Sequence, residues 1–123
     1  MALQEALKTI TIEAGGDLSA DQWKFVKVAA DGQCDLNTVS GGRCNGVLLN
    51  DPAAAGRDAE IAISGRVKVK AGGTVAAGAT VSSNGSGLAV TSVTTGHHVQ
   101  GHCLVGGASG ELIEVQLGYN GII

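Results

Sequence analysis

The sequence has few aromatic residues and almost no proline. Its 123 residues include one Trp, one Phe, one Tyr and a single Pro. Aromatic side chains bury the largest areas per residue, so the core has to be thin and aliphatic. A chain of this length forms one domain with a modest core, and oligomerisation is a natural way for it to bury more surface.

The chain also lacks an excess of charge of one sign. Eight Lys and Arg against eleven Asp and Glu give a net charge of −3. Binding to nucleic acid requires clustered Lys and Arg. The longest basic stretch, residues 66–70, alternates basic residues with valine, which is typical of a strand with one solvated face. We therefore expect no nucleic-acid partner.

Long apolar runs are absent too. No stretch approaches the roughly 18 apolar residues of a membrane span, and residues 1–5 lack the basic start and apolar stretch of a secretory signal. We expect no membrane partner and synthesis in the cytoplasm. Cysteine is scarce, and the odd number formed by Cys34, Cys44 and Cys103 fits poorly with a disulfide framework. These thiols are expected to be reduced and buried.

Glycine, in contrast, is abundant, and its positions repeat. Residues 14–20 correspond to 71–77, and residues 60–63 correspond to 114–117. Between these stretches, glycines match in order at an offset that shortens from 57 to 55 and then 54 positions: Gly32 with Gly87, Gly41 with Gly96, Gly46 with Gly101, and Gly56 with Gly110. The pattern predicts a single β domain over 10–123 that is made of two repeats, about 10–65 and 67–118.

Short strands are expected within each repeat. Apolar and polar residues alternate, or β-prone residues gather, over 10–13, 23–28, 46–49, 60–63, 67–70, 80–81, 88–93 and 113–117. Turns that contain glycine separate these stretches. The spacing predicts an all-β fold, a small antiparallel β-barrel or β-sandwich. Asn84 and Gly85 are expected at the centre of a type I′ hairpin turn, where both residues need a positive φ.

The first nine residues form the part of the chain with helical spacing. Leu3, Leu7 and Ile10 would share one face of a helix, although so short a helix is marginal without tertiary support. Residues 1–9 are therefore expected to form an N-terminal arm, and an extended arm that orders on a partner is an equal alternative to the helix.

The best candidate for a metal site is formed by His97, His98, His102 and Cys103, because imidazole and thiolate bind zinc and copper. On a strand, however, residues four apart lie about 13 Å from each other. His102 and Cys103, as neighbours in a strand, point to opposite faces. In the first repeat Val47 and Leu48 stand at their positions. We expect no metal and no other cofactor.

Catalytic motifs are not evident. No serine stands in a Gly-x-Ser-x-Gly turn between a strand and a helix, no pair of carboxylates is defined well enough for acid–base chemistry, and neither glycine pair leads into a phosphate-binding helix. The sequence therefore indicates a protein that binds rather than an enzyme.

Several stretches resemble the head decoration, or capsid cement, proteins of tailed bacteriophages. They comprise the opening strand and Gly-Gly turn, a Gly-Val-Leu segment, a Pro-Ala-rich loop, a strand that ends in Ser-Gly, and a Val- and Ala-Gly-rich run: residues 9–18, 46–49, 52–56, 61–65 and 67–78. The resemblance covers about residues 9–118. It implies a compact, tulip-like β fold on the outer surface of the mature head, with no catalytic residues.

The same resemblance implies a virion protein that binds the major capsid protein. Such proteins form homotrimers at local three-fold sites and stabilise the expanded head. The arm would reach over the capsid protein, with Leu3, Leu7 and Ile10 as the expected contacts. Two alternatives stay open: another phage structural β-module of a tail, fibre or baseplate (or a host adhesion domain), and a small metal- or ligand-binding β protein that uses the histidines and Cys103.

Overall fold

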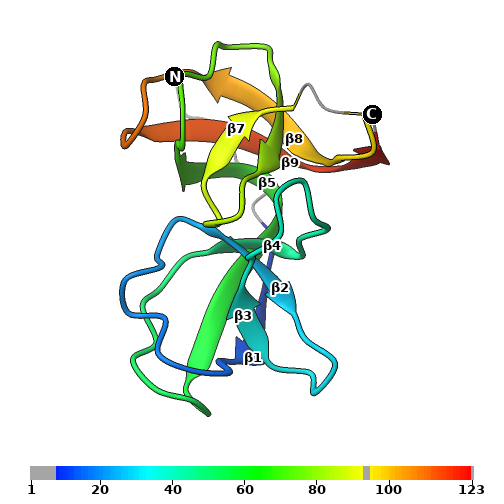
Figure 1. Cartoon of the computed structure of the whole chain (residues 1–123). Helices are drawn as coiled ribbons and strands as arrows, with labels where there is room; N and C mark the ends of the chain where they lie inside the picture. Colours follow the sequence, from blue (N-terminus) through cyan, green and yellow to red (C-terminus); the bar gives the residue numbers. More distant parts are fainter. Residues whose placement is uncertain (1–7, 93–94, 123) are drawn as a thin grey trace.

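The computed structural model describes residues 8–92 and 95–122, which form two stacked lobes joined by one long strand (Figure 1). Within these residues there are nine strands and no helix, hence no helix able to span a membrane. The strands are β1 (Lys8–Glu13), β2 (Phe25–Val28), β3 (Cys34–Leu36), β4 (Gly46–Leu48), β5 (Asp58–Lys70), β6 (Thr80–Ser83), β7 (Ala89–Thr91), β8 (His98–Val105) and β9 (Leu112–Ile122). The prediction of an all-β fold is confirmed.

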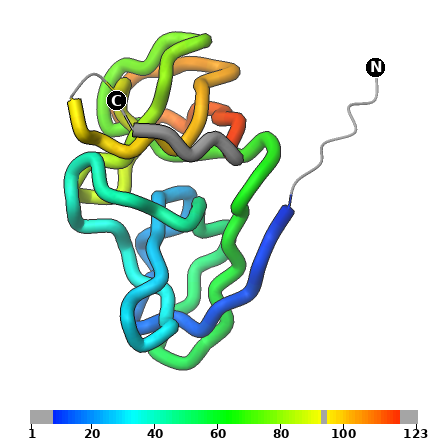
Figure 2. Tube along the Cα trace, turned by 90° about the vertical axis from the view of Figure 1, so that its right-hand side faces the viewer, coloured from blue at the N-terminus to red at the C-terminus, as the bar shows by residue number. Residues whose placement is uncertain are grey.

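Each lobe is an antiparallel sheet that curls into a half-barrel. The lower lobe has the order β3-β2-β4-β5, with β1 on the other edge of β5, and the upper lobe has the order β5-β9-β8-β6-β7. A single parallel bridge brings the two edges of each sheet together, between Ala14 and Cys34 below and between Ala71 and Ala89 above. The trace in Figure 2 shows the two curled sheets one above the other.

Strand β5 runs through both lobes. The expectation that a strand ends at Ser64 and Gly65 is wrong, because β5 continues for 13 residues. Ser64 pairs with Lys8 of β1, and Gly65 pairs with Leu117 of β9. Gly65 has a φ of 98°, a conformation that only glycine adopts without strain. It therefore bends the strand from one sheet into the next without interrupting it.

The two lobes share one hydrogen-bond scheme. Gly15 N donates to Cys34 O at 2.8 Å, and Gly72 N donates to Ala89 O at 2.7 Å. Gly56 and Gly110, which the sequence matches, also close equivalent turns, because both have a positive φ. Gly56 N donates to Ala14 O, just after β1, and Gly110 N donates to Ala71 O, just after β5. Residues at matched positions thus have matched partners, and a duplication as the origin of this likeness stays a prediction.

Two matched glycines are required by close approach of the strands. A Cβ on Gly46 would lie 2.0 Å from Ala62 O, and a Cβ on Gly101 would lie 2.1 Å from Gln116 O. Real Cβ atoms never come so close to a carbonyl, so a side chain at either position would push β4 from β5 or β8 from β9. These glycines decide how tightly each half-barrel curls.

The core is thin and aliphatic, as the composition predicts. In the lower lobe it consists of Ala14, Leu18, Val26, Cys34, Leu48, Ala59 and Ile61. The upper core is larger, because residues on the outward face of the lower sheet, among them Phe25, Val47 and Ala62, pack into it. Each of these three is fully buried. The upper core is therefore continuous across the two lobes.

The turn at residues 84–88 differs from the predicted hairpin. Neither Asn84 nor Gly85 has a positive φ; the left-handed residue is Gly87, with a φ of 74°. The Asn84 side chain accepts hydrogen bonds from Ser86 N at 2.9 Å and Leu88 N at 3.0 Å. Asparagine stabilises turns in this way by mimicking a backbone carbonyl, so a five-residue loop replaces the two-residue turn.

Two predicted boundaries also shift. Lys8 and Thr9, which were assigned to the N-terminal arm, lie in β1 and pair with β5. The strand predicted from residue 23 begins only at Phe25, because Trp23 has a φ of 68°. The matched position in the upper lobe is Gly78, with a φ of 86°. Trp23 therefore adopts a left-handed conformation for which the matched position has a glycine.

A buried polar network ties a lower-lobe loop to the upper lobe. Asn37 is 1% exposed, and its Nδ2 donates to Val39 O and to Ser83 Oγ, both at 2.8 Å. Gly41 N donates to Ser83 O at 2.7 Å, and Gln100 Nε2 donates to Gly42 O at 3.1 Å. These hydrogen bonds thus attach the loop over residues 37–42 to the upper sheet.

A first prediction concerns the close approach of β8 and β9. Gly101→Ala should lower the free energy of unfolding by about 3 kcal/mol, because the added methyl group overpacks against a backbone carbonyl. Gly73→Ala is the matched control: its Cβ meets no atom within 4 Å, so the change should be neutral or stabilise by up to about 1 kcal/mol. Urea denaturation measures both. Equal stability of the two variants would contradict the close contact.

A second prediction concerns the junction of the lobes. Asn37→Ala should lower the free energy of unfolding by about 1–3 kcal/mol, since the buried Ser83 hydroxyl loses the donor that ties the loop to the upper lobe. Asn45→Ala is the control, because the exposed Asn45 side chain also accepts a backbone hydrogen bond, from Val28 N at 2.8 Å, but water can replace it. Thermal unfolding of the two variants side by side decides the matter; a larger loss for Asn45→Ala would refute the assignment.

Candidate functional site

The outward faces of the two sheets differ although their backbones match. On the lower sheet, Phe25, Val47 and Ala62 are cross-strand neighbours that the upper lobe covers. The matched row on the upper sheet is polar and reaches solvent, and consists of Thr80, His102 and Gln116. In stacked repeats, the last unit presents a polar outer face. The upper sheet therefore ends the stack.

His102 and Cys103 lie where the sequence comparison places them. His102 pairs with Gln116 as Val47 pairs with Ala62, and its ring is partly buried on the outward face. Cys103 points the opposite way, into the upper core, and is 2% exposed. The prediction that these two residues point to opposite faces is confirmed, so they do not converge on one metal ion.

His97 and His98 belong to the junction between the lobes. The His97 ring lies directly against Gly41, where a Cβ would come within 2.1 Å of a ring atom. His98 N donates to Gly41 O at 2.9 Å. Both residues thus help to hold the loop over residues 37–42. Within the described parts of the chain, no three His, Cys, Asp or Glu side chains gather as ligands for a metal.

All three cysteines are free and buried, as predicted. Burial raises the pKa of the Cys34 thiol to about 11, with a smaller contribution from the charge of Asp35. Burial also raises the pKa of Cys44 to about 11 and that of Cys103 above its ordinary value. The thiolate is the nucleophile and the metal ligand, so at neutral pH these groups act as small apolar core residues.

The expected capsid contacts divide between the described and the undescribed parts of the chain. Leu3 and Leu7 lie outside the described residues. Ile10 lies in β1, where it is partly buried and packs against the lower core. Its side chain therefore contributes to the fold, and its contact with a capsid stays a prediction.

The upper lobe carries an exposed apolar end that sequence reasoning missed. Leu104, Val105 and Leu112 are 39%, 45% and 47% exposed, and they lie where β8 ends and β9 begins. A bulge after Cys103 sets Val105 opposite Glu114, and bulges re-aim side chains in this way. We call these three residues the apolar end. Comparing the repeats would have found it, because two of the matched residues are the polar Asn50 and Asp58.

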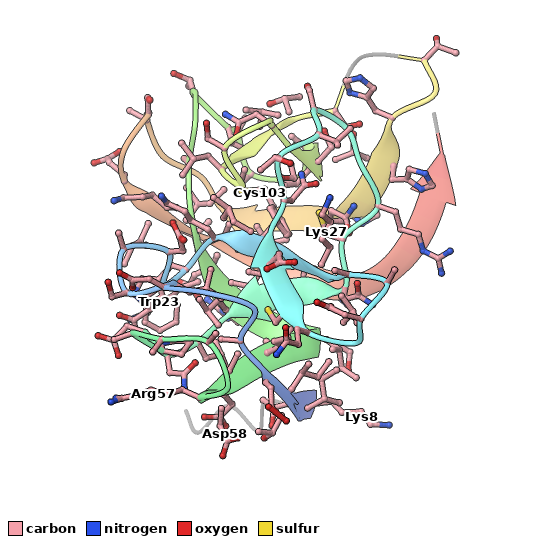
Figure 3. All side chains as sticks on the ribbon, turned by 60° about the horizontal axis from the view of Figure 1, so that its bottom comes forward. Lys8, Trp23, Lys27, Arg57, Asp58 and Cys103 are labelled. Atoms are coloured by element: carbon pink, nitrogen blue, oxygen red, sulfur yellow. The ribbon has the colours of Figure 1, made fainter. Side chains whose placement is uncertain are left out.

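The lower lobe carries an acidic end at the matched place. Glu13, Asp58 and Glu60 are exposed on β1 and the start of β5. Beside them lies an open hollow of about 470 Å³, lined by Asn50, Asp51, Pro52, Gly56, Arg57 and Asp58. Figure 3 shows Arg57 and Asp58 at this extremity, their side chains directed away from each other. We call Glu13, Asp58 and Glu60 the acidic end.

The chain resembles known phage proteins in its sequence family and in its fold. No curated protein matches the sequence. The fold is similar to a solved structure, the head fiber gp8.5 N base of bacteriophage phi29, with a TM-score of 0.71 and 14% sequence identity over 95% of this chain and 98% of that one. Residues 4–117 match the family of phage cement proteins. The chain belongs to this family and is a structural protein on the capsid of the virion.

Proposed function

We propose that the protein binds the outer surface of a phage capsid lattice as a homotrimer at local three-fold sites, contacts the major capsid protein and stabilises the expanded head. The observation that carries the proposal is the family match over nearly the whole chain. The likeness of fold to a head fiber base supports it.

The fold has the properties that such a role requires. The two lobes are joined by a continuous strand and a buried network, so a load on one lobe passes to the other along the backbone of β5 and through the hydrogen bonds of Asn37 and Ser83. The chain carries exposed surfaces at both ends, and many modest contacts repeated over a symmetric lattice add up to strong total binding. The protein therefore needs no deep pocket.

The direct test mixes the purified protein with expanded capsids that lack it. We expect the protein to sediment with the capsids and to raise their resistance to heat. Tagged protein located by electron microscopy should lie on the outer surface at three-fold positions. If it neither sediments with the capsids nor protects them, the proposed role is wrong.

A third prediction concerns the N-terminal residues. Deletion of residues 1–7, which spares β1, should weaken capsid binding at least tenfold while the thermal unfolding of the isolated protein stays unchanged. Leu3→Ala with Leu7→Ala should reproduce most of the loss, because apolar groups carry much of the binding at such contacts. Gln4→Ala is the control and should bind normally. Binding curves from capsid sedimentation measure all three, and unchanged binding after the deletion would remove the arm from the proposal.

A further inference from the structure

The matched strand pairs of the two lobes carry opposite charges. In the lower lobe β1 pairs with the first half of β5, and in the upper lobe the second half of β5 pairs with β9. The outward positions on β1 hold Thr9, Thr11 and Glu13. The matched positions on β5 hold Arg66, Lys68 and Lys70. The two matched strand pairs are therefore acidic at one end of β5 and basic at the other.

Two carboxylates face each other at the acidic end. Glu13 and Asp58 are cross-strand partners and both are exposed, and like charges directly opposite destabilise a sheet. Neither forms an ion pair within residues 8–92 and 95–122. Glu13 and Asp58 thus keep their negative charge without an ion-pair partner among the described residues, although Arg57 lies beside Asp58.

At the matched place in the upper lobe a lysine stands beside an apolar residue. Lys70 pairs with Leu112, and Lys68 pairs with Glu114. Glu114 also forms an ion pair with Arg66, which leaves the exposed Lys68 and Lys70 to give this edge its positive charge. The apolar end and these two lysines form a continuous edge, which we call the basic-apolar edge.

Two residues of the apolar end, Val105 and Leu112, are not needed for the fold. In the lower lobe Asn50 and Asp58 stand at the positions of Val105 and Leu112. The Asn50 side chain donates to Asp58 O and accepts from Glu60 N, both at 2.9 Å. The same half-barrel therefore forms with polar residues at this edge. Exposed apolar side chains that gather without a folding role mark a surface for a partner.

We propose that copies of this chain associate head to tail, with the basic-apolar edge of one copy against the acidic end of the next. This inference deepens the proposed homotrimer and rests on it. The partner is a second copy because the chain itself presents the complementary charges: lysines 68 and 70 at one end of β5, and Glu13, Asp58 and Glu60 at the other.

The positions of the two surfaces make the contact intermolecular. β5 begins at Asp58 and ends at Lys70, so the surfaces lie at opposite extremities of the molecule (Figure 1) and cannot meet within one chain. A contact between two different patches repeats from copy to copy, and it closes into a ring when the rotation allows. The hollow and the exposed Ala53–Ala55 segment next to the acidic end offer room for the protruding apolar end.

The test grafts lower-lobe residues onto the upper lobe. Val105→Asn with Leu112→Asp copies a pair that the matched half-barrel already accommodates, so the fold should be retained; circular dichroism checks this. Light scattering and sedimentation equilibrium on the full chain then measure self-association. The graft should raise the dissociation constant about tenfold or more. It removes apolar contact, and it places the new carboxylate at position 112 against the carboxylates of the acidic end of the next copy. Arg43→Glu, an exposed change in a loop away from both ends, is the control and should associate normally.

Charge exchange makes the test specific. Lys68→Glu with Lys70→Glu should weaken association, as should Glu13→Lys with Glu60→Lys. All four changes together should restore the dissociation constant to within about threefold of the original, because the pairs are complementary again. Oligomers that persist in every variant would overturn the head-to-tail contact but leave the trimer standing. A monomeric unmodified protein that still binds capsids would overturn both the contact and the trimer, but not the capsid role.

Discussion

The shared strand β5 is the element on which the rest of the structure depends. Its first half completes the lower half-barrel against β1 and β4, and its second half starts the upper one against β9. Residues 58–62 pair within the lower lobe and residues 65–70 within the upper one, so the lobes cannot separate without breaking a sheet. This is possible because Gly65 turns the strand through a positive φ in place of ending it.

A thin core explains why the lobes stack. With one phenylalanine and no other aromatic side chain among the fully buried residues, a single half-barrel of about 55 residues would bury little, and small domains are marginal for this reason. The outward face of the lower sheet packs into the upper core, and the Phe25 side chain is part of that face. The upper sheet keeps the same backbone but shows Thr80, His102 and Gln116 to solvent. The outward face of the lower sheet thus adds buried area to the upper core, and the matched face of the upper sheet stays in contact with solvent.

Much of the fold and part of the site follow from the sequence. Alternation over β1, β5 and β9 and the matched glycines correctly predict an all-β chain with equivalent turns, and the position of His102 and Cys103 in one strand correctly predicts that their side chains point to opposite faces. Prediction fails where side-chain bonding or long-range pairing decides: Asn84 builds a longer loop through its own amide, and Ser64-Gly65 continues a strand because β9 lies beside it. The exposed apolar end escaped notice because burial depends on neighbours distant in the chain.

The sequence by itself determined the local pattern: which residues alternate between the two faces of a strand, where glycine-containing turns fall, and which positions match between the halves. These are properties of a few consecutive residues and their permitted dihedral angles. Only the tertiary structure decided which outward face is covered, that one strand serves both lobes, and that the acidic and basic-apolar surfaces lie at opposite ends. Those outcomes depend on strand partners up to half the chain apart, and no local pattern encodes which strand will lie beside which.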